Sequence, residues 1–403
     1  MPTVGTNAKR WVIERVAMDI IKTTDALKSA CDAFAKFKFV TVDTEFLRES
    51  TFWPKLCLVQ MASPEHAVII DVLCEGLDLT PFFELMRDES IVKVFHAARQ
   101  DIEIIVHLAG FVPHPVFDTQ VAAMVCGFGD SISYDQLVGK ITGARIDKSS
   151  RFTDWSRRPL SDKQLTYALA DVTHLRDVYS FLSANLAEQN RSEWVHEEME
   201  VLTSQETYEL LPENAWTRLK LRIKKSLDFA VLMKLAEWRE HSARSRDVPR
   251  NRVLKDDAIY ELATQQPSDQ KALAALRSIP RGFEKSRTAH EILAVIAEAK
   301  EIPADQLPKL PRGKPSPDGT SAAVDLLKVL LKMTSEENGV AAKVIATVDD
   351  LEKIAADDNA DVVALKGWRR ELFGNVAIEV KNGHKALAFN GRKVVLFNRE
   401  QTG

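Results

Sequence analysis

Two acidic side chains, Asp43 and Glu45, stand at the end of a short apolar run that is typical of a buried strand. The run includes the β-branched residues Val40 and Val42. Because side chains alternate along a strand, Asp43 and Glu45 should project from the same face. Two adjacent carboxylates repel each other unless they bind a metal cation, share a proton or reach solvent. Taken alone, the pair fits a metal site or an ordinary polar strand end.

A third acidic residue, Asp101, lies where a predicted strand at residues 91–95 turns into a helix. The side chains three and four positions away on either side are alanine or isoleucine, so no local ion pair accounts for the charge. An aspartate in the first turn of a helix is also typical of a cap or a partner of the helix dipole. By itself, Asp101 does not distinguish these roles from a functional one.

A fourth carboxylate, Asp171, belongs to a long helix that the capping-box sequence Ser161–Gln164 begins. Spacings of four and three residues place Tyr167, Asp171 and His174 on one face of that helix. No lysine or arginine lies three or four positions from Asp171. The face fits either a functional site or a surface pair of Asp171 and His174 with Tyr167 at the margin of the core.

Together, Asp43, Glu45, Asp101 and Asp171 are four acidic side chains without local partners, set among apolar neighbours. Ligand sets made only of oxygen suit Mg²⁺ or Mn²⁺, whereas zinc prefers cysteine and histidine. Two such ions about 3.5–4 Å apart can clamp the reacting groups of an in-line phosphoryl transfer. The four residues therefore indicate a candidate site for two divalent ions.

The first half of the chain alternates between strand and helix patterns. The ranges predicted as strands are 40–46, 56–62, 67–72 and 91–95, and those predicted as helices are 20–37, 80–88, 101–109, 119–126, 134–142 and 161–187. Three strands in quick succession favour an antiparallel start of the sheet. This layout predicts an α/β domain in which helices flank a mixed sheet.

From about residue 193 the pattern becomes helical. Helices are predicted at 216–243, 255–264, 268–277 and 287–300, and a second helical block at 321–373. Between the two blocks, residues 303–320 hold five prolines and two glycines, which is a linker composition. The dipeptide Asn390-Gly391 between two apolar runs predicts a hairpin near the C-terminal end.

These patterns divide the chain into segments: 1–205 an α/β domain with frayed residues 1–10, 206–302 a first helical domain, 303–320 a linker, 321–380 a second helical domain, and 381–403 a hairpin tail. A length of 403 residues suits two or three domains. The net charge of −4 excludes a polycation, so contact with nucleic acid requires a local basic surface.

The four cysteines, Cys31, Cys57, Cys74 and Cys126, show no metal-binding spacing and are expected to be reduced, buried thiols. Charged residues interrupt any apolar segment near the N-terminus, so no signal peptide is expected. No apolar run approaches the length of a membrane span. These features predict a soluble, cytoplasmic protein without a membrane partner.

The three acidic motifs, Asp43–Glu45, His96–Asp101 and Tyr167–Asp171, resemble those of the four-carboxylate 3′→5′ exonucleases. Tyrosine four residues before the last aspartate is similar to the tyrosine subclass of these enzymes. The surrounding sequence resembles the ribonuclease D family over about residues 20–190; the stretches that carry this similarity are Val42–Arg48, Phe52–Gln60, Asp118–Gln120, Asp154–Trp155 and Pro159–Ser161.

The similarity to ribonuclease D continues into the helical part. The stretches there are Trp216, Leu235–Glu240, Arg252–Asp256 and Ile279–Gly282, and they resemble the HRDC domain that this family shares with RecQ-type helicases. Residues 321–375 are similar to a second, more divergent copy. The resemblance implies a ribonuclease H-like exonuclease domain with a mixed sheet, followed by two small all-α HRDC domains.

The resemblance also implies roles for individual residues. Asp43, Glu45 and Asp171 would hold the Mg²⁺ or Mn²⁺ that activates water. Asp43 would bridge to a second ion, which Asp101 would support through water. Tyr167 would orient the attacking water with its hydroxyl, and no covalent intermediate would form.

A basic stretch is the candidate for holding RNA. Between Arg218 and Lys255, twelve lysines and arginines face four acidic residues. A solvated helix face explains such a run, but in an acidic chain it also fits a surface that contacts phosphates. The candidate RNA-binding residues are Arg222, Lys224, Lys225, Arg250 and Arg252 in this stretch, Arg151, Arg157 and Arg158 near the Tyr167 helix, and Phe46, Phe52 and Trp53, which fit either base stacking or core packing.

The activity implied is that of a metal-dependent 3′→5′ exoribonuclease that trims structured RNA, tRNA precursors above all, and releases 5′-mononucleotides. The partner is then RNA, and no obligate protein partner is evident. One alternative is a DNA 3′→5′ exonuclease, although the chain lacks the P-loop of a helicase. The other is an RNA-binding protein without activity, which the presence of all four carboxylates and Tyr167 disfavours.

Overall fold

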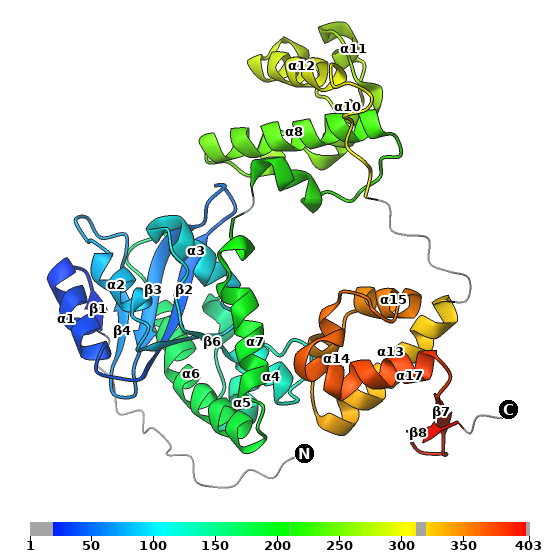
Figure 1. The fold of residues 1–403 in the computed structure, drawn as a ribbon. Helices are drawn as coiled ribbons and strands as arrows, with labels where there is room; N and C mark the ends of the chain where they lie inside the picture. The colour runs from blue at the N-terminus through cyan, green and yellow to red at the C-terminus, as the bar shows by residue number, and fades with distance from the viewer. Residues whose placement is uncertain (1–18, 210, 312–319, 400–403) are drawn as a thin grey trace.

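The computed structural model describes residues 19–209, 211–311 and 320–399, so the expected fraying of residues 1–10 lies outside the described residues. The described chain forms an α/β domain, then two groups of helices, then a hairpin (Figure 1). None of the helices in these ranges combines the length and hydropathy that crossing a bilayer requires.

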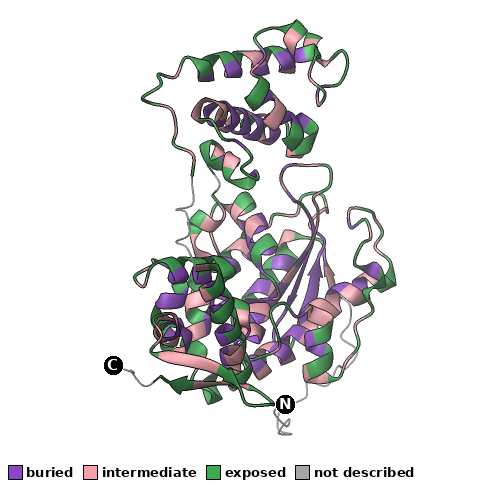
Figure 2. Cartoon of the chain, turned by 90° about the vertical axis from the view of Figure 1, so that its right-hand side faces the viewer, coloured by how far each residue is buried: buried purple, intermediate pink, exposed green. Residues whose placement is uncertain are grey.

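A mixed sheet forms the centre of the α/β domain, as the sequence predicts. In the described residues it contains six strands in the order β1-β4-β3-β2-β5-β6. Their bounds are β1 Asp19–Ile21, β2 Phe39–Leu47, β3 Lys55–Ala62, β4 Ala67–Ile70, β5 Val92–Phe95 and β6 Val116–Asp118. Strand β2 pairs antiparallel with β3 and parallel with β5, so the strand that carries Asp43 and Glu45 is central. The strands of this sheet are largely buried (Figure 2).

Helices cover the two faces of the sheet. They are α1 Thr24–Phe34, α2 Thr80–Arg87, α3 Arg99–Ala109, α4 Thr119–Val125, α5 Tyr134–Thr142, α6 Asp162–Glu188 and α7 Ser192–Thr203. The long helix α6 lies across β2, β3 and β4. Ser161 and Gln164 form the expected capping box at its start, and Leu165, Val172 and Leu182 are buried along its inner face. The helix is therefore fixed at its first turn and along its length.

The first helical group has a core of its own. It comprises the short helix η3 Pro212–Arg218 and α8 Ser226–Ser245, α9 Arg250–Val253, α10 Asp256–Gln265, α11 Gln270–Ala274 and α12 Arg287–Lys300. Its apolar cluster takes in Phe52 from the loop between β2 and β3. The backbone N–H groups of Phe52 and Trp53 both donate to Asp247, at 3.0 and 3.1 Å. The β2–β3 loop thus attaches the first helical group to the α/β domain.

The second helical group shares its core with the α/β domain. It comprises α13 Thr320–Asn338, α14 Ala342–Ile345, α15 Val348–Ala356, α16 Gly367–Arg369 and α17 Asn375–Lys381, and the hairpin β7 Lys385–Phe389 and β8 Val394–Asn398 follows it. Trp194 of α7 stacks on Trp368, with ring centroids 4.3 Å apart. Gly127 packs so closely that a Cβ there would lie 2.5 Å from the carbonyl oxygen of Gly339. Buried apolar residues form one continuous cluster across this junction.

Two of the predicted helices are wrong in part. The segment predicted as one helix over 20–37 begins with a strand, because Ile20 and Ile21 pair with β4 before the N-cap Thr23 starts α1. The segment predicted as a helix over 216–243 is broken: η3 ends at Arg218 and α8 begins at Ser226. The basic residues between them are therefore on an extended stretch, and the hairpin predicted around Asn390-Gly391 is present.

Candidate active site

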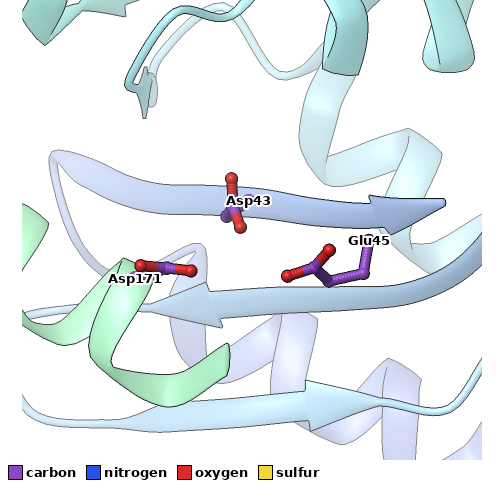
Figure 3. Close-up of side chains that lie close together, drawn as sticks. All are labelled: Asp43, Glu45 and Asp171. Atoms are coloured by element: carbon purple, nitrogen blue, oxygen red, sulfur yellow. The ribbon is translucent and has the colours of Figure 1, made fainter. Parts of the chain in front are cut away.

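Three of the predicted acidic residues converge on one point. Asp43 and Glu45 of β2 and Asp171 of α6 each place a carboxylate oxygen within 4.8 Å of the others (Figure 3). The alternation of side chains along β2 puts the first two on the face that α6 covers. The packing of α6 on β2 therefore brings Asp171 next to Asp43 and Glu45, although it is far from them in the sequence.

Two hydrogen bonds fix α6 on either side of Asp171. The hydroxyl of Thr41, on β2, donates to the carbonyl oxygen of Val172 at 2.8 Å. The hydroxyl of Tyr134, on α5, donates to the carbonyl oxygen of Ala170 at 3.0 Å. Because both donors are part-buried or buried side chains of neighbouring elements, they set the position of the Asp171 backbone relative to β2.

The fourth carboxylate, Asp101, lies beside this cluster in the first turn of α3. It is buried and accepts a short hydrogen bond from the hydroxyl of Thr44, the residue between Asp43 and Glu45. The turn that leads into α3 is held by Asp118, whose carboxylate accepts from the N–H groups of Ala97 and Ala98 at 3.0 and 2.8 Å. Ala97 has a φ of 60°, which is rare outside glycine. Asp118 thus stabilises a strained turn that aims Asp101.

The electrostatics of the four carboxylates are unfavourable without a cation. Burial is the largest cause, and it raises the pKa of Asp43 and Asp101 well above the usual range. Burial together with the nearby carboxylates raises the pKa of Glu45 to about 10, and burial raises that of Asp171 to about 7. The charge of Arg151 opposes the increase for Glu45 and Asp171. Among the described residues, however, no lysine or arginine forms an ion pair with any of the four.

The donor set fits divalent cations of the Mg²⁺ type. All four candidate ligands are carboxylates, and three of them can reach one point. Gln60 supplies a second observation. It is fully buried, it faces Asp43 across the β2–β3 ladder, and within the described chain neither its amide nitrogen nor its amide oxygen has a hydrogen-bond partner. Directly opposite residues of an antiparallel pair share a face of the sheet, so this orphaned amide belongs to the cluster.

Tyr167 lies one helical turn before Asp171, and its phenol interacts with that carboxylate. Burial and the charges of Asp171, Glu45 and Asp43 raise the pKa of the phenol above its usual value, so it stays protonated. Its ring tilts against Trp155, with centroids 6.2 Å apart. The hydroxyl is therefore a fixed proton donor at the edge of the carboxylate cluster.

The RNA-binding candidates in the α/β domain differ in their exposure and in the hydrogen bonds that they already make within the protein. Arg157 is exposed, with an ion pair to Asp154 on the surface. Arg158 donates to both carboxylate oxygens of Asp71 and to the carbonyl of Cys57, so its hydrogen bonds are made within the protein. Phe46 is half-buried against the main core.

Phe52 and Trp53 lie at the junction with the first helical group. Phe52 is buried in the core of that group. Trp53 is half-buried and stacks on His107 of α3, with ring centroids 4.0 Å apart. Both rings therefore pack between the α/β domain and the helical group.

The candidates of the basic stretch divide in the same way. Arg222, Lys224, Lys225 and Arg252 are exposed, and the guanidinium of Arg222 lies over the ring of Tyr260. Arg250 is half-buried and forms two hydrogen bonds with the buried Glu240, at 2.5 and 2.7 Å. Four of the five therefore face solvent, while Arg250 also ties α9 to α8.

One exposed aromatic residue, Phe152, was not predicted from the sequence. It is 90% exposed and lies in the loop before α6. The guanidinium of its neighbour Arg151 sits 5.1 Å from the centre of its ring, and the same Arg151 acts electrostatically on Glu45 and Asp171. The adjacent arginine was the available signal, because proteins that bind single strands combine aromatic and basic side chains.

Comparisons with known proteins agree with this architecture. The family model described as 3'-5' exonuclease matches residues 18–187, and the model described as HRDC domain matches residues 228–296. The crystal structure of Escherichia coli RNase D, described as an exoribonuclease involved in structured RNA processing, aligns with a TM-score of 0.80 and 29% identity. It covers 92% of this chain and 100% of that one. The fold and the acidic cluster thus define a 3′→5′ exonuclease.

The particular family follows from curated relatives. A ribonuclease D from Nitrobacter hamburgensis is 58% identical over 95% of this chain and 100% of that protein. A ribonuclease D from Bartonella henselae is 49% identical over 94% of this chain and 93% of that protein. The chain belongs to the ribonuclease D family and is a 3′→5′ exoribonuclease whose substrate is RNA.

Proposed function

We propose that this exoribonuclease trims the 3′ ends of structured RNA, tRNA precursors in particular, and releases 5′-mononucleotides. The convergence of Asp43, Glu45 and Asp171 carries the proposal, because three buried carboxylates with oxygens within 4.8 Å of one another suit hydrolysis of a phosphodiester. The description of the Escherichia coli relative as an enzyme of structured RNA processing supports the choice of substrate. We also propose a cytoplasmic location, in keeping with the bacterial origin of the ribonuclease D relatives.

We further propose that the site holds two divalent ions, Mg²⁺ or Mn²⁺. Asp43, Glu45 and Asp171 would hold one ion, and Asp43 together with Asp101 would hold the other. Bound there, such ions lower the pKa of a coordinated water and offset negative charge in the transition state. The Thr44 hydroxyl donates to Asp101 and orients it. The Gln60 amide lies directly opposite Asp43 and has no partner among the described residues, so it is available to a ligand of the ions.

The residues of the chain supply the remaining steps. The Tyr167 hydroxyl, which is protonated and lies beside Asp171, would orient the attacking water toward the scissile phosphorus. Arg151 and Arg157 lie in the loop that precedes α6 and would meet the RNA backbone near this point. The exposed residues Arg222, Lys224, Lys225 and Arg252 would hold the phosphates of the strand further upstream.

The experiment is the digestion of matched RNA and DNA oligonucleotides and of a tRNA precursor with an extended 3′ end, all labelled at the 5′ end. We expect the RNA oligonucleotide to shorten stepwise and the tRNA precursor to lose its 3′ extension in Mg²⁺ or Mn²⁺, and both reactions to stop in EDTA. The D43N variant should lose activity by about 100-fold or more, because a charge that holds the cation is removed.

Two outcomes would contradict the proposal. Faster removal of DNA ends than RNA ends would favour the DNA exonuclease. Full activity of Asp43→Asn would remove the metal assignment. The matched control is Asp32→Asn, because Asp32 is an exposed residue of α1 whose ion pair with Lys28 lies on the surface. Titration of Mn²⁺ into the D43N variant, followed by calorimetry, gives a readout that does not depend on activity.

A further inference from the structure

A cavity of about 270 Å³ lies at the junction of the α/β domain and the first helical group. It is separate from the carboxylate cluster. Its walls come from the end of β2 and the loop after it, from η3, and from the turn into α9. The lining residues that carry charge are Arg48, Arg218, Arg239, Arg250 and Asp256. Four guanidinium groups around one cavity indicate an anion as the ligand.

Three of these arginines already have partners in the protein. Arg48 forms a two-point pair with Glu103 of α3, at 2.8 and 2.9 Å. Arg250 pairs with the buried Glu240. Arg239 donates to Asp256 and to the carbonyl of Leu254. These contacts hold the guanidinium groups in place and leave their combined charge only partly balanced.

Arg218, the last residue of η3, differs from the other three. Among the described residues its side chain takes part in no hydrogen bond and no ion pair, and it is exposed at the cavity wall. Loss of solvation by burial is the largest cause that lowers its pKa, and the charge of Arg250 adds to it. A positive side chain beside other positive side chains gains most from a bound anion.

The position of the cavity favours the phosphate of an RNA strand over other anions. Arg48 follows Glu45 by three residues, which corresponds to about 10 Å along an extended chain. Glu103, its partner, follows Asp101 by two residues on α3. On the other side, Arg218 continues directly into the exposed stretch that carries Lys220, Arg222, Lys224 and Lys225. The cavity thus lies between the carboxylates and a basic surface.

We propose that this cavity, with Arg218 as its central ligand, binds one phosphodiester of the RNA upstream of the 3′ nucleotide being removed. The proposal rests on the proposed function, since it gives the substrate of that site a fixed point of attachment. It makes the length of the RNA matter. A substrate too short to reach the cavity gains nothing from it, and a longer one does.

The test uses the full chain and RNA oligonucleotides in which one linkage at a time carries a neutral methylphosphonate. Binding is measured by fluorescence anisotropy in EDTA, so that no cleavage occurs. For the unmodified chain, we expect one upstream linkage at which neutralisation weakens binding by about 10-fold. In Arg218→Ala, natural RNA should bind about 10-fold more weakly, neutralisation at that linkage should have no further effect, and the salt slope should fall by about one.

The matched control is Arg287→Ala, because Arg287 is a 93% exposed arginine of α12 in the same helical group. It should leave both affinity and linkage profile unchanged. An R218A variant that keeps the linkage effect would overturn the proposal, and so would an unmodified chain with no sensitive linkage. Competition by inorganic phosphate or AMP that displaces no RNA would agree with a backbone site, whereas full displacement by AMP would assign the cavity to the product instead.

Failure of the proposed function can be told apart from failure of this site. A chain that binds RNA with the expected linkage profile but degrades no RNA would leave the cavity assigned and remove the exonuclease proposal. If the chain degrades a dinucleotide and a decamer equally well, both with and without Arg218, the exonuclease proposal stands and the cavity proposal is wrong. Thermal unfolding of R218A should match that of the unmodified chain, because the arginine makes no contact that folding requires.

Discussion

At the scale of single residues, the acidic motifs could be predicted because their types and spacing are read locally. Alternation along a strand put Asp43 and Glu45 on one face, and the lack of a local cation singled out Asp101 and Asp171. The partner that each arginine has in the fold could not be predicted in this way. Arg158, for example, is paired with Asp71, which lies 87 positions earlier in the chain. Only the tertiary fold decides which basic side chains are already paired.

The exposed ring of Phe152 gives the first residue-scale prediction. We expect Phe152→Ala to lower kcat/KM for an RNA oligonucleotide by about 10-fold, since stacking of a base on an aromatic ring contributes about 1–3 kcal/mol. The thermal midpoint should not change, because the ring is 90% exposed and covers nothing apolar. The measurement is the initial rate of 3′ shortening at several RNA concentrations.

The control for Phe152 is Phe389→Ala. Phe389 is also a mostly exposed phenylalanine, at 68%, but it lies on the hairpin strand β7. Its replacement should leave the rate unchanged. Equal losses in the two variants would mean that the effect of Phe152 is not local to the site.

The buried amide of Gln60 gives the second residue-scale prediction. In Gln60→Leu, two polar atoms that lack partners are replaced by apolar atoms of similar volume, so stability in EDTA should be unchanged or higher. Affinity for Mn²⁺ should fall about 10–100-fold, as it does when a polar group beside the metal ligands is lost. Calorimetric titration of Mn²⁺ measures this directly.

The comparison variant for Gln60 is Gln136→Leu, an exposed position on α5. It should bind Mn²⁺ as the unmodified chain does. A Q60L variant with unchanged Mn²⁺ affinity and lower stability would show that Gln60 only fills space in the sheet.

At the scale of elements, the segments with a clear pattern were predicted, and the two three-residue strands were not. Helix α6 is recognisable in the sequence from its capping box and a stripe of apolar residues. Strands β1 and β6 have three residues each, too few for any periodic pattern, and they exist because the edges of the sheet pair with them. The prediction of one helix over 216–243 was wrong around Lys224 and Lys225. The chain is not helical there, because η3 and α8 pack against each other and the segment between them connects the two.

The contact between α8 and α9 gives a prediction about pH. Burial by itself would raise the pKa of Glu240, but hydrogen bonds from Arg250 and Arg244 outweigh it and lower the pKa below 4.5. A carboxyl group with a lowered pKa in the folded state stabilises the protein above its unfolded pKa, and this contribution is lost as pH falls through the folded value. The first helical group should therefore lose stability as pH drops below about 4.5.

The variant that tests this is Glu240→Gln. At pH 7 it should destabilise the first helical group by about 3–5 kcal/mol, because two arginines lose a buried partner. Its unfolding temperature should depend less on pH between 5 and 3 than that of the unmodified chain. The control is Glu237→Gln, which removes only a half-exposed pair with Lys234 and should cost less than about 1 kcal/mol. Parallel pH curves for E240Q and the unmodified chain would refute the assignment.

At the scale of the whole molecule, the sequence indicated the order of the segments but not their attachment. The first helical group has a core of its own, to which the α/β domain contributes Phe52. The second helical group continues the core of the α/β domain, with Trp194 stacked on Trp368 and Arg369 paired with Glu197 and Glu198 of α7. The linker of residues 303–320 separates the two helical groups in the sequence. Contacts such as Arg369–Glu197, 172 positions apart, nevertheless make the second group part of the α/β unit.

This difference in attachment predicts how the molecule unfolds. Differential scanning calorimetry should show two transitions, one for the first helical group and one for the α/β domain together with the second helical group. In Trp368→Ala, loss of a buried ring should cost about 3–5 kcal/mol and lower the second transition as a whole. The transition that Mn²⁺ raises identifies the one that contains the carboxylates, because a ligand stabilises the unit that binds it.

Trp238→Ala is the matched control, since Trp238 packs against the core of the first helical group and donates to Glu291. It should lower only the transition that Mn²⁺ leaves unchanged. If Trp368→Ala instead produced a third transition and left the Mn²⁺-sensitive one in place, the second helical group would be an independent unit. In that case the second helical group would unfold separately from the α/β domain despite the continuous core. The stack of Trp194 on Trp368 would then hold the two parts together without making them one folding unit.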